Sequence, residues 1–412
     1  MERLVGIYIF DPELTAGKMI FLTGPRQVGK TTFARSWLKS AESDETYFNW
    51  DDPSVMLAYT RNPLHFHNVI DEKFKGGRVP LVFDEIHKQR GWRNLLKGLF
   101  DAQGERISLL VTGSARLGFI QKSGDSLLGR YFSFQMFPLG LAEVVDDFSF
   151  MLHDERPLAD GKRLASLARE ASKKELEEGL ALLMKFGGFP EPLVRESERF
   201  HRRWQTEYKK LLTRDEIRDI SRVSDLKGIE TLVELLPTKV GSPLSIPSLS
   251  SDLNRKYDTV KSWLEMLEAL YMVFTLRPWH KNISRAIKKE KKLYFSDWSF
   301  LSESGRRFEN LMAVALCRMA ARFTESGIGQ FEICYIRDRE KREVDFVLVK
   351  DNAPLALFEA KTAESSASAG ASYFSNKLNI PLFQIALRAK KVEAFPGGRF
   401  LIPAANFLLL TG

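Results

Sequence analysis

The segment Gly24–Thr31 has the residue types and spacing of a loop that wraps around phosphate groups. It lies between an apolar stretch, Met19–Leu22, which indicates a strand, and a helical stretch that begins near Thr32. Glycines let such a loop bring backbone N–H groups close to phosphate oxygens, while a lysine reaches the β and γ phosphates and the next hydroxyl ligates Mg²⁺. We therefore expect ATP and Mg²⁺ here, with Thr31 on the metal. The expected nucleotide-binding residues are Gly24, Pro25, Arg26, Gln27, Val28, Gly29, Lys30, Thr31 and Thr32.

A second strand-like run, Val79–Phe83, delivers two acidic residues, Asp84 and Glu85, at its carboxyl end. We expect Asp84 to hold Mg²⁺ through water and Glu85 to polarise the water that attacks the γ-phosphate. The alternative is that both carboxylates only cap the following helix. The order of the two motifs, each in the context of a strand, favours hydrolysis.

Two further residues are candidates for catalysis. Ser114 follows a third strand, Leu109–Thr112, and either Ser114 or Thr112 could contact the γ-phosphate, although a hydroxyl that only ends the strand explains the pattern equally well. Arg130 precedes another strand and is the candidate arginine that reaches the nucleotide of a neighbouring subunit. That role predicts a homo-oligomer. A salt bridge to a nearby carboxylate is the alternative.

The elements that position these residues follow from the hydrophobic pattern. From about residue 17 to residue 145 short apolar runs alternate with helical stretches, which predicts an α/β fold with a parallel sheet. Polar helical patterns continue to residue 222 and indicate a lid beside the nucleotide. We expect four domains: an ATPase core over residues 1–149, a helical lid over 150–222, a winged-helix domain over 223–297 and an α/β domain over 298–412.

The nucleotide-binding motifs resemble those of AAA+ ATPases. The resemblance rests on Phe21–Thr32, Thr112–Ser114, Gly129–Tyr131 and Gly187–Pro190, which are similar to a widespread prokaryotic ATPase family. Members of that family join the ATPase to a C-terminal domain that resembles nucleases. The resemblance covers nearly the whole chain and implies an ATP-hydrolysing enzyme.

Residues 225–296 predict three helices, a strand, a basic loop and a second strand, which is the order of a winged helix. Between Lys281 and Lys292 six of twelve residues are basic, against the single acid Glu290. Such a density indicates contacts with DNA phosphates, and a solvated surface is the alternative. The expected DNA-contacting residues are Lys281, Arg285, Lys288, Lys289, Lys291 and Lys292.

Two strand-like runs near the end of the chain predict a hairpin with the five-residue loop Lys350–Pro354. A loop centred on Asn352 sets Asp345 opposite Glu359, and two facing carboxylates destabilise a sheet unless a cation lies between them. The period of two places Lys361 on the same face as Glu359, where the ammonium could orient or deprotonate a water beside a metal.

This helix and hairpin order resembles the PD-(D/E)xK nucleases. The resemblance implies that Asp345 and Glu359 hold Mg²⁺, that Lys361 assists the attacking water, and that Glu309 on the preceding helix supports the metal. The alternative is a domain that has the nuclease-like fold, serves as a binding module and has no cleavage activity.

Composition excludes several classes of protein. The 412 residues are 44% hydrophobic with a net charge of +8, and no apolar run is long enough to span a bilayer. The N-terminus does not look like a signal peptide, and two cysteines, Cys317 and Cys334, form no zinc-binding spacing with the histidines. We expect a cytoplasmic AAA+ ATPase that binds DNA through the winged helix and carries a nuclease-like domain. The alternatives are a regulatory signalling ATPase and a DNA-holding motor with a silent nuclease fold.

Overall fold

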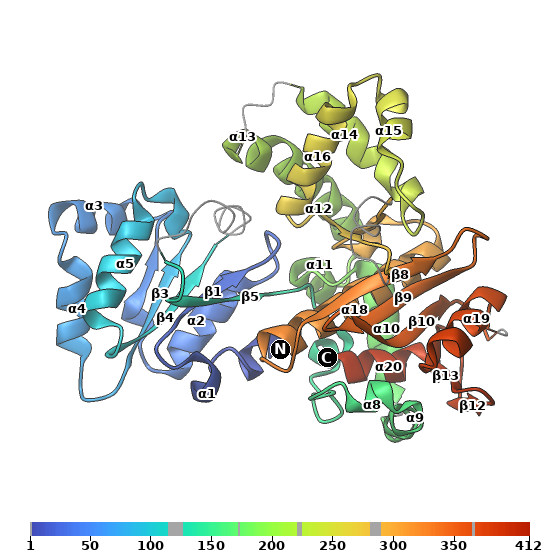
Figure 1. Cartoon of the computed structure of the whole chain (residues 1–412). Coiled ribbons are helices and arrows are strands. Elements are labelled where there is room, and N and C mark those ends of the chain that lie inside the picture. Colours follow the sequence, from blue (N-terminus) through green and yellow to red (C-terminus); the bar gives the residue numbers. More distant parts are fainter. Residues whose placement is uncertain (1, 114–126, 172–173, 221–224, 281–289, 365–366) are drawn as a thin grey trace. The chain divides into compact units, whose positions relative to one another are not determined.

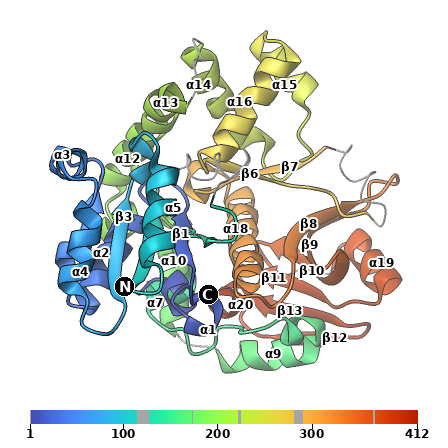
Figure 2. The same ribbon diagram turned by 60° about the vertical axis from the view of Figure 1, so that its left-hand side comes forward.

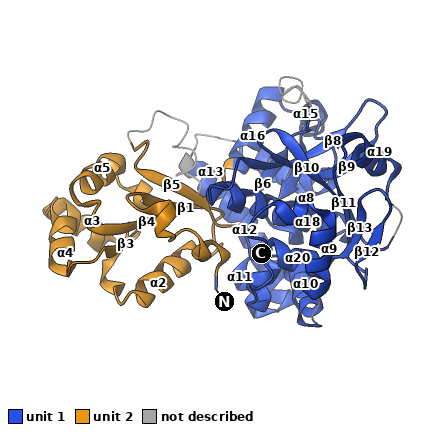
Figure 3. Cartoon of the chain, turned by 60° about the horizontal axis from the view of Figure 1, so that its bottom comes forward, with its two compact units in different colours: residues 1–2, 138–268, 272–412 blue, residues 3–137, 269–271 orange. Residues whose placement is uncertain are grey.

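The computed structural model describes residues 2–113, 127–171, 174–220, 225–280, 290–364 and 367–412 (Figure 1). The chain forms two compact units (Figure 3). The N-terminal unit comprises Arg3–Phe137 together with Ala269–Tyr271, and the C-terminal unit is built mainly from Pro138–Glu268 and Met272–Gly412. The end of the N-terminal unit at Phe137 precedes the domain boundary that we expected after residue 149, so the segment that follows Phe137 folds with the C-terminal unit.

The N-terminal unit contains a five-stranded sheet in the order β2-β3-β4-β1-β5, and every neighbouring pair is parallel. The predicted parallel α/β sheet is therefore confirmed. Its strands are β1 (Met19–Thr23), β2 (Tyr47–Asn49), β3 (Val79–Asp84), β4 (Ile107–Thr112) and β5 (Tyr131–Gln135). The helices of this unit are η1 (Leu4–Ile7), α1 (Pro12–Thr15), α2 (Lys30–Ser40), η2 (Asp44–Thr46), α3 (Pro53–Arg61), α4 (His65–Lys73), η3 (Ile86–Lys88) and α5 (Trp92–Gln103).

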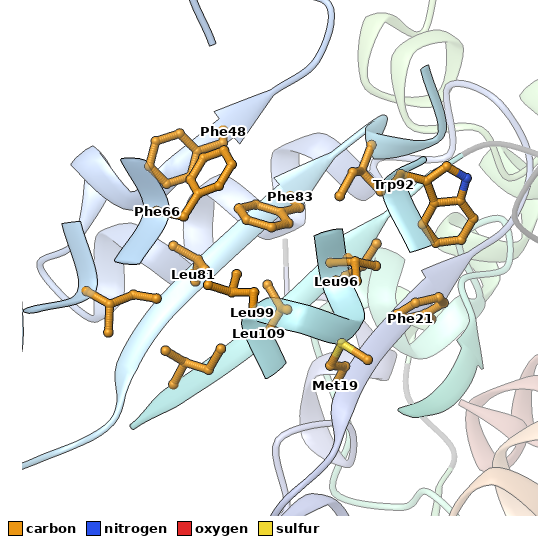
Figure 4. Close-up of a cluster of buried hydrophobic side chains, with 14 of the residues drawn as sticks. Met19, Phe21, Phe48, Phe66, Leu81, Phe83, Trp92, Leu96, Leu99 and Leu109 are labelled. Carbon is orange, nitrogen blue, oxygen red and sulfur yellow. The ribbon is translucent and has the colours of Figure 1, made fainter. Parts of the chain in front are cut away.

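One face of this sheet is closed by an apolar cluster beneath α4 and α5 (Figure 4). Phe66 of α4 packs edge to face on Phe48 of β2, with ring centroids 4.9 Å apart, and also contacts Phe83 of β3. Leu96 and Leu99 of α5 are buried in the same cluster. Because β3 is covered in this way, the residues at its carboxyl end have a rigid support.

The sheet register brings the carboxyl ends of β1, β3 and β4 together. Leu22 pairs with Thr112, and Thr112 pairs with Asp84 on its other side. The loop that leaves β1, the acidic end of β3 and the hydroxyl end of β4 therefore share one edge of the sheet, where ligands of open parallel sheets bind.

The C-terminal unit contains a six-stranded mixed sheet in the order β12-β13-β11-β10-β9-β8. Strands β8, β9 and β10 are antiparallel, and β10, β11 and β13 are parallel. Helix α19 packs its Phe374 in the core that contains Val347 and Leu357, whereas Phe407 of α20 contacts Phe358 on the other face. The strands are β8 (Phe331–Arg337), β9 (Glu343–Lys350), β10 (Ala353–Lys361), β11 (Leu382–Ala386), β12 (Glu393–Phe395) and β13 (Arg399–Pro403). The flanking helices are α18 (Ser304–Glu325), α19 (Ala369–Leu378) and α20 (Ala404–Thr411).

The segment between Pro138 and residue 220 is helical, as expected, and belongs to the C-terminal unit. Its Gly187–Pro190 turn lies against the short helix η6 (Trp298–Phe300), because a Cβ on Gly188 would lie 2.6 Å from the Trp298 ring. The role of this segment as a lid stays a prediction. Its helices are α7 (Leu141–Val145), α8 (Arg156–Ala159), α9 (Gly161–Glu170), α10 (Lys174–Phe186), α11 (Pro190–Arg195), α12 (Glu198–Lys210), η4 (Leu211–Glu216) and α13 (Ile217–Ile220).

A group of three helices and a two-stranded sheet follows in the same unit (Figure 2). Its strands are antiparallel, and Pro243 adds an isolated bridge to Lys292. The order of elements is the expected one, and its assignment as a winged helix stays a prediction. The elements are α14 (Leu226–Leu235), η5 (Leu236–Lys239), α15 (Ile246–Leu253), α16 (Tyr257–Ala269), β6 (Val273–Leu276) and β7 (Lys292–Phe295). None of the described helices is both long and apolar enough to span a bilayer.

Candidate functional site

The loop after β1 adopts a conformation that only glycine permits at its first position. Gly24 has φ +140°, and a Cβ there would lie 2.3 Å from the carbonyl oxygen of Met136. Gly29, with φ +103°, turns the chain into α2, whose first residue is Lys30. The first N–H groups of a helix have no acceptor within the helix, so this end of α2 carries a partial positive charge that favours an anion at the loop.

The side chain of Lys30 is buried inside the loop. Its ammonium donates to the carbonyl oxygens of Gly24 at 2.9 Å and of Pro25 at 2.7 Å. Both acceptors are neutral, so a phosphate oxygen would be a stronger partner for the same ammonium. The geometry supports the expected role of Lys30 in binding phosphate.

Asp84 is buried at the end of β3 and accepts hydrogen bonds from three hydroxyl groups. Thr31 donates at 2.7 Å, Tyr47 donates at 2.5 Å, and Thr112 donates to the other carboxylate oxygen. Burial and the bond to Asp84 raise the pKa of Tyr47, so its phenol remains a donor. Thr31 and Asp84 together offer the oxygen ligands that Mg²⁺ prefers, and the residues fit that ion.

Tyr47 was missed at the sequence level. Its hydroxyl reaches Asp84 because β2 pairs with β3, with Tyr47 opposite Val82, and no spacing in the sequence encodes that pairing. The guanidinium of Arg35 lies 4.1 Å from the centre of the Tyr47 ring and holds the ring in place. Tyr47 is thus a further residue that orients Asp84.

Glu85 follows Asp84 in a left-handed conformation, with φ +56°. Its side chain makes no cap hydrogen bond to the helix that follows, which argues against the capping alternative. Burial raises the pKa of Glu85, and the nearby Arg26 opposes this effect. Within the described part of the chain, Glu85 Oε2 is buried without a hydrogen-bond partner, and His87 Nε2 lies 3.4 Å away. A carboxylate with an unused acceptor is suited to orient a water molecule.

Of the two other candidates for catalysis, the structure describes only Arg130. Ser114 lies outside the described residues, and the Thr112 hydroxyl is committed to Asp84. Arg130 donates to Asp101 of α5 at 2.6 Å, which matches the salt-bridge alternative. Because Met19 at the start of β1 pairs with Tyr131, Arg130 lies at the amino edge of the sheet, away from the loop that follows Thr23. An arginine-finger role stays a prediction and would require release from Asp101.

The basic segment is described only at its end. Lys281, Arg285, Lys288 and Lys289 lie outside the described residues, and Lys291 is exposed. Lys292 was expected to contact DNA phosphates, and this expectation is wrong because β7 turns the side chain inward. Only 1% of Lys292 is exposed, and its Nζ lies 2.6 Å from Glu343 Oε1.

The β9–β10 hairpin has the expected register at its far end. Phe346 pairs with Phe358, so the next residues, Asp345 and Glu359, face each other. The turn itself is tighter than the expected five-residue loop, because Asp351 and Asn352 both adopt positive φ and a two-residue turn results. A bulge between Pro354 and Ala356 then restores the register.

The expected nuclease-like residues lie close together, and their role as a metal site stays a prediction. The Tyr294 hydroxyl donates to Glu309 at 2.8 Å, and Lys361 Nζ lies 3.4 Å from Glu359 Oε1. Burial raises the pKa of Tyr294 and of Glu309, and the neighbouring carboxylates Glu309 and Asp345 respectively raise these pKa values further. Across the described ranges no three His, Cys, Asp or Glu side chains are arranged to hold a metal ion. The proximity of the residues is supported, and the metal site is not.

Residues 16–145 match the family model of an AAA domain, and residues 177–307 match a domain of unknown function (DUF8612). The first match and the sheet together show that the N-terminal unit contains a P-loop domain of the AAA type. The uncharacterized protein MJ1544 of Methanocaldococcus jannaschii is 26% identical over 83% of this chain and 75% of that protein. The uncharacterized protein MJ1637 of the same organism is 22% identical over 68% of this chain and 60% of that protein.

Among solved structures, the Aeropyrum pernix ORC1 protein in complex with DNA is similar to this chain. The likeness covers 71% of this chain and 86% of that one, at 15% identity and a TM-score of 0.29. Because this likeness is weak, it carries no argument, and the assignment of the AAA domain rests on the family match and on the geometry of the site.

Proposed function

We propose that this protein is a Mg²⁺-dependent ATPase whose nucleotide site lies at the carboxyl edge of β1, β3 and β4. The observation that carries the proposal is the joint placement of the Lys30 ammonium inside its loop and of Thr31 beside Asp84. Lys30 binds the phosphates, Thr31 and Asp84 hold Mg²⁺, and Glu85 orients the attacking water. When it is bound, Mg²⁺ would neutralise part of the negative charge of the phosphates.

Nucleotide binding tests this assignment. A fluorescent ATP analogue with Mg²⁺ should bind the full chain, and Lys30→Ala should weaken binding by about a hundredfold or more, since a buried charged donor is removed. The matched control is Lys39→Ala, which changes an exposed lysine at the other end of the same helix. Equal affinity of Lys30→Ala and Lys39→Ala would contradict the proposal.

We further propose that the C-terminal unit binds DNA through a winged helix, residues 223–297, and a nuclease-like domain, residues 298–412. The order of α14, α15, α16, β6 and β7 supports the first part. A cavity of about 670 Å³ supports the second, because Pro278 and Glu290, which flank the basic segment in the sequence, line it. Its lining contains two arginines, Arg337 and Arg339, and two acids, Glu290 and Asp338, so the positive charge that suits a phosphate backbone comes from the basic segment.

DNA binding at several salt concentrations separates this proposal from a regulatory ATPase that binds a protein partner. We expect a linear fall of log affinity with log salt, and replacement of Lys288, Lys289 and Lys291 by glutamine should reduce the slope by roughly one unit for each lost phosphate contact. Lys292 is left unchanged because it is buried. Absence of binding to linear, branched and single-stranded DNA would favour the regulatory ATPase.

A further inference from the structure

Lys292 is among the largest fully buried side chains of the described residues, although it ends a strongly basic segment. All four residues of β7 are buried, so neither face of this strand returns the side chain to solvent. Placing an unpaired ammonium in such an environment costs several kcal/mol. Its burial therefore requires fixed negative charge nearby.

That negative charge comes from the sheet and from α18. Lys292 Nζ lies 2.6 Å from Glu343 Oε1, and Arg337 Nη1 lies 3.1 Å from the other oxygen of the same carboxylate. Burial raises the pKa of both Asp345 and Glu309, and for each of them Lys292 lowers the pKa more than any other charged group does. One ammonium thus acts on carboxylates from two elements, β9 and α18.

Several acceptor oxygens of the carboxylates Asp345, Glu359 and Glu309 are used within the protein. The Ala360 N–H donates to Asp345 Oδ2 at 3.0 Å, and the Ser368 N–H donates to Glu359 Oε2 at 3.3 Å. Glu309 is enclosed as well, because a Cβ on Gly241, which has φ +76°, would lie 2.9 Å from each of its two oxygens. These contacts leave little room for the six ligands that Mg²⁺ requires.

The charges of the cluster nearly balance without a metal ion. Four carboxylates face three basic groups, which leaves one negative charge (four minus three). The carboxylates are Glu309, Glu343, Asp345 and Glu359, and the basic groups are Lys292, Arg337 and Lys361.

We propose that Lys292 takes the position of a divalent cation in this cluster, so that the nuclease-like domain is held together by an internal ion-pair network and binds no metal there. The proposal goes beyond the ATPase and DNA-binding functions and depends on neither. It implies that any DNA held by this domain is not cleaved at the carboxylate cluster.

Thermal unfolding of the nucleotide-free full chain, with and without millimolar Mn²⁺, tests the proposal. Mn²⁺ should leave the Tm of the wild type unchanged, and the same should hold for Lys291→Met, the exposed neighbouring lysine. Lys292→Met should unfold at a lower temperature, and Mn²⁺ should raise its Tm by about 5 °C or more, since the carboxylates are then free to bind a cation. Adding Asp345→Asn should abolish that rise.

Three results would overturn the proposal. One is a rise in the Tm of the wild type with Mn²⁺ that Asp345→Asn removes, and another is a folded Lys292→Met variant with no response to Mn²⁺. If Lys292→Met does not fold, the double variant Lys292→Met/Glu343→Gln removes one charge of each sign and should fold. A double variant that is no more stable than Lys292→Met is the third contradicting result.

Discussion

Thr112→Val isolates the hydrogen bond that connects β4 to the acidic end of β3. Thr112 is fully buried and donates to Asp84, which is itself only 2% exposed. Valine fills nearly the same volume, so the variant removes a donor without opening a cavity. A hydrogen bond to a charged group contributes about 1.5–3 kcal/mol, and no correction for solvent is needed at a buried site. The unfolding free energy of the sheet should fall by about that amount.

Amide hydrogen exchange of peptides from β3 and β4 measures this loss. The calculated change corresponds to exchange that is about 10- to 150-fold faster, since 1.4 kcal/mol is a factor of ten. The matched control is Thr60→Val in α3, whose exposed hydroxyl donates to the carbonyl oxygen of Met56 at 2.8 Å. The control should stay within about 0.5 kcal/mol of the wild type. Equal effects of the two variants would refute the anchoring of Asp84 by Thr112.

Three further outcomes are expected. Gly24→Ala should abolish nucleotide binding because its Cβ would lie 2.3 Å from a carbonyl oxygen at φ +140°, whereas Gly98→Ala, with open space around its Cβ, should bind like the wild type in the same titration. The pKa of Glu309 is raised from 4.5 to about 7, so the folded state retains a proton that the unfolded state releases. Unfolding free energy should therefore fall as the pH rises from 4.5 to about 7, by at most about 1.4 kcal/mol per pH unit, and denaturant titrations of Glu309→Gln should show a weaker fall. If Arg130 acts on the nucleotide of a neighbouring subunit, specific ATPase activity should rise with protein concentration and Arg130→Ala should remove that rise. The same concentration dependence in the wild type and in Arg130→Ala would leave Arg130 only its salt bridge to Asp101.

The nucleotide site could be predicted because its information is local. A contiguous loop between a strand and a helix carries the glycines, Lys30 and Thr31, and the apolar run before Asp84 identifies a buried strand. Tyr47 could not be found in this way, since its hydrogen bond to Asp84 depends on which strand lies next to β2 in the sheet. Pairing between distant strands leaves no fixed spacing in the sequence.

In the C-terminal unit one feature could be predicted from the sequence and another could not. The facing of Asp345 and Glu359 was expected from a long loop, and it arises instead from a two-residue turn and a bulge that compensate each other. The burial of Lys292 could not be foreseen, because a run of basic residues indicates a solvated surface and the carboxylates that stabilise the inward side chain, among them Glu343, are distant in the sequence. Charge patterns thus locate a basic segment, whereas tertiary contacts decide which of its members are exposed.

The most direct test of the nucleotide site is ATP hydrolysis by Glu85→Gln compared with the wild type. Both proteins should bind ATP with similar affinity, because the substitution leaves Lys30, Thr31 and Asp84 in place. Hydrolysis by Glu85→Gln should fall by about 10²- to 10⁴-fold, the usual contribution of a positioned general base. Equal rates of hydrolysis by the two proteins at saturating ATP and Mg²⁺ would contradict the assignment of Glu85 and of the site built around it.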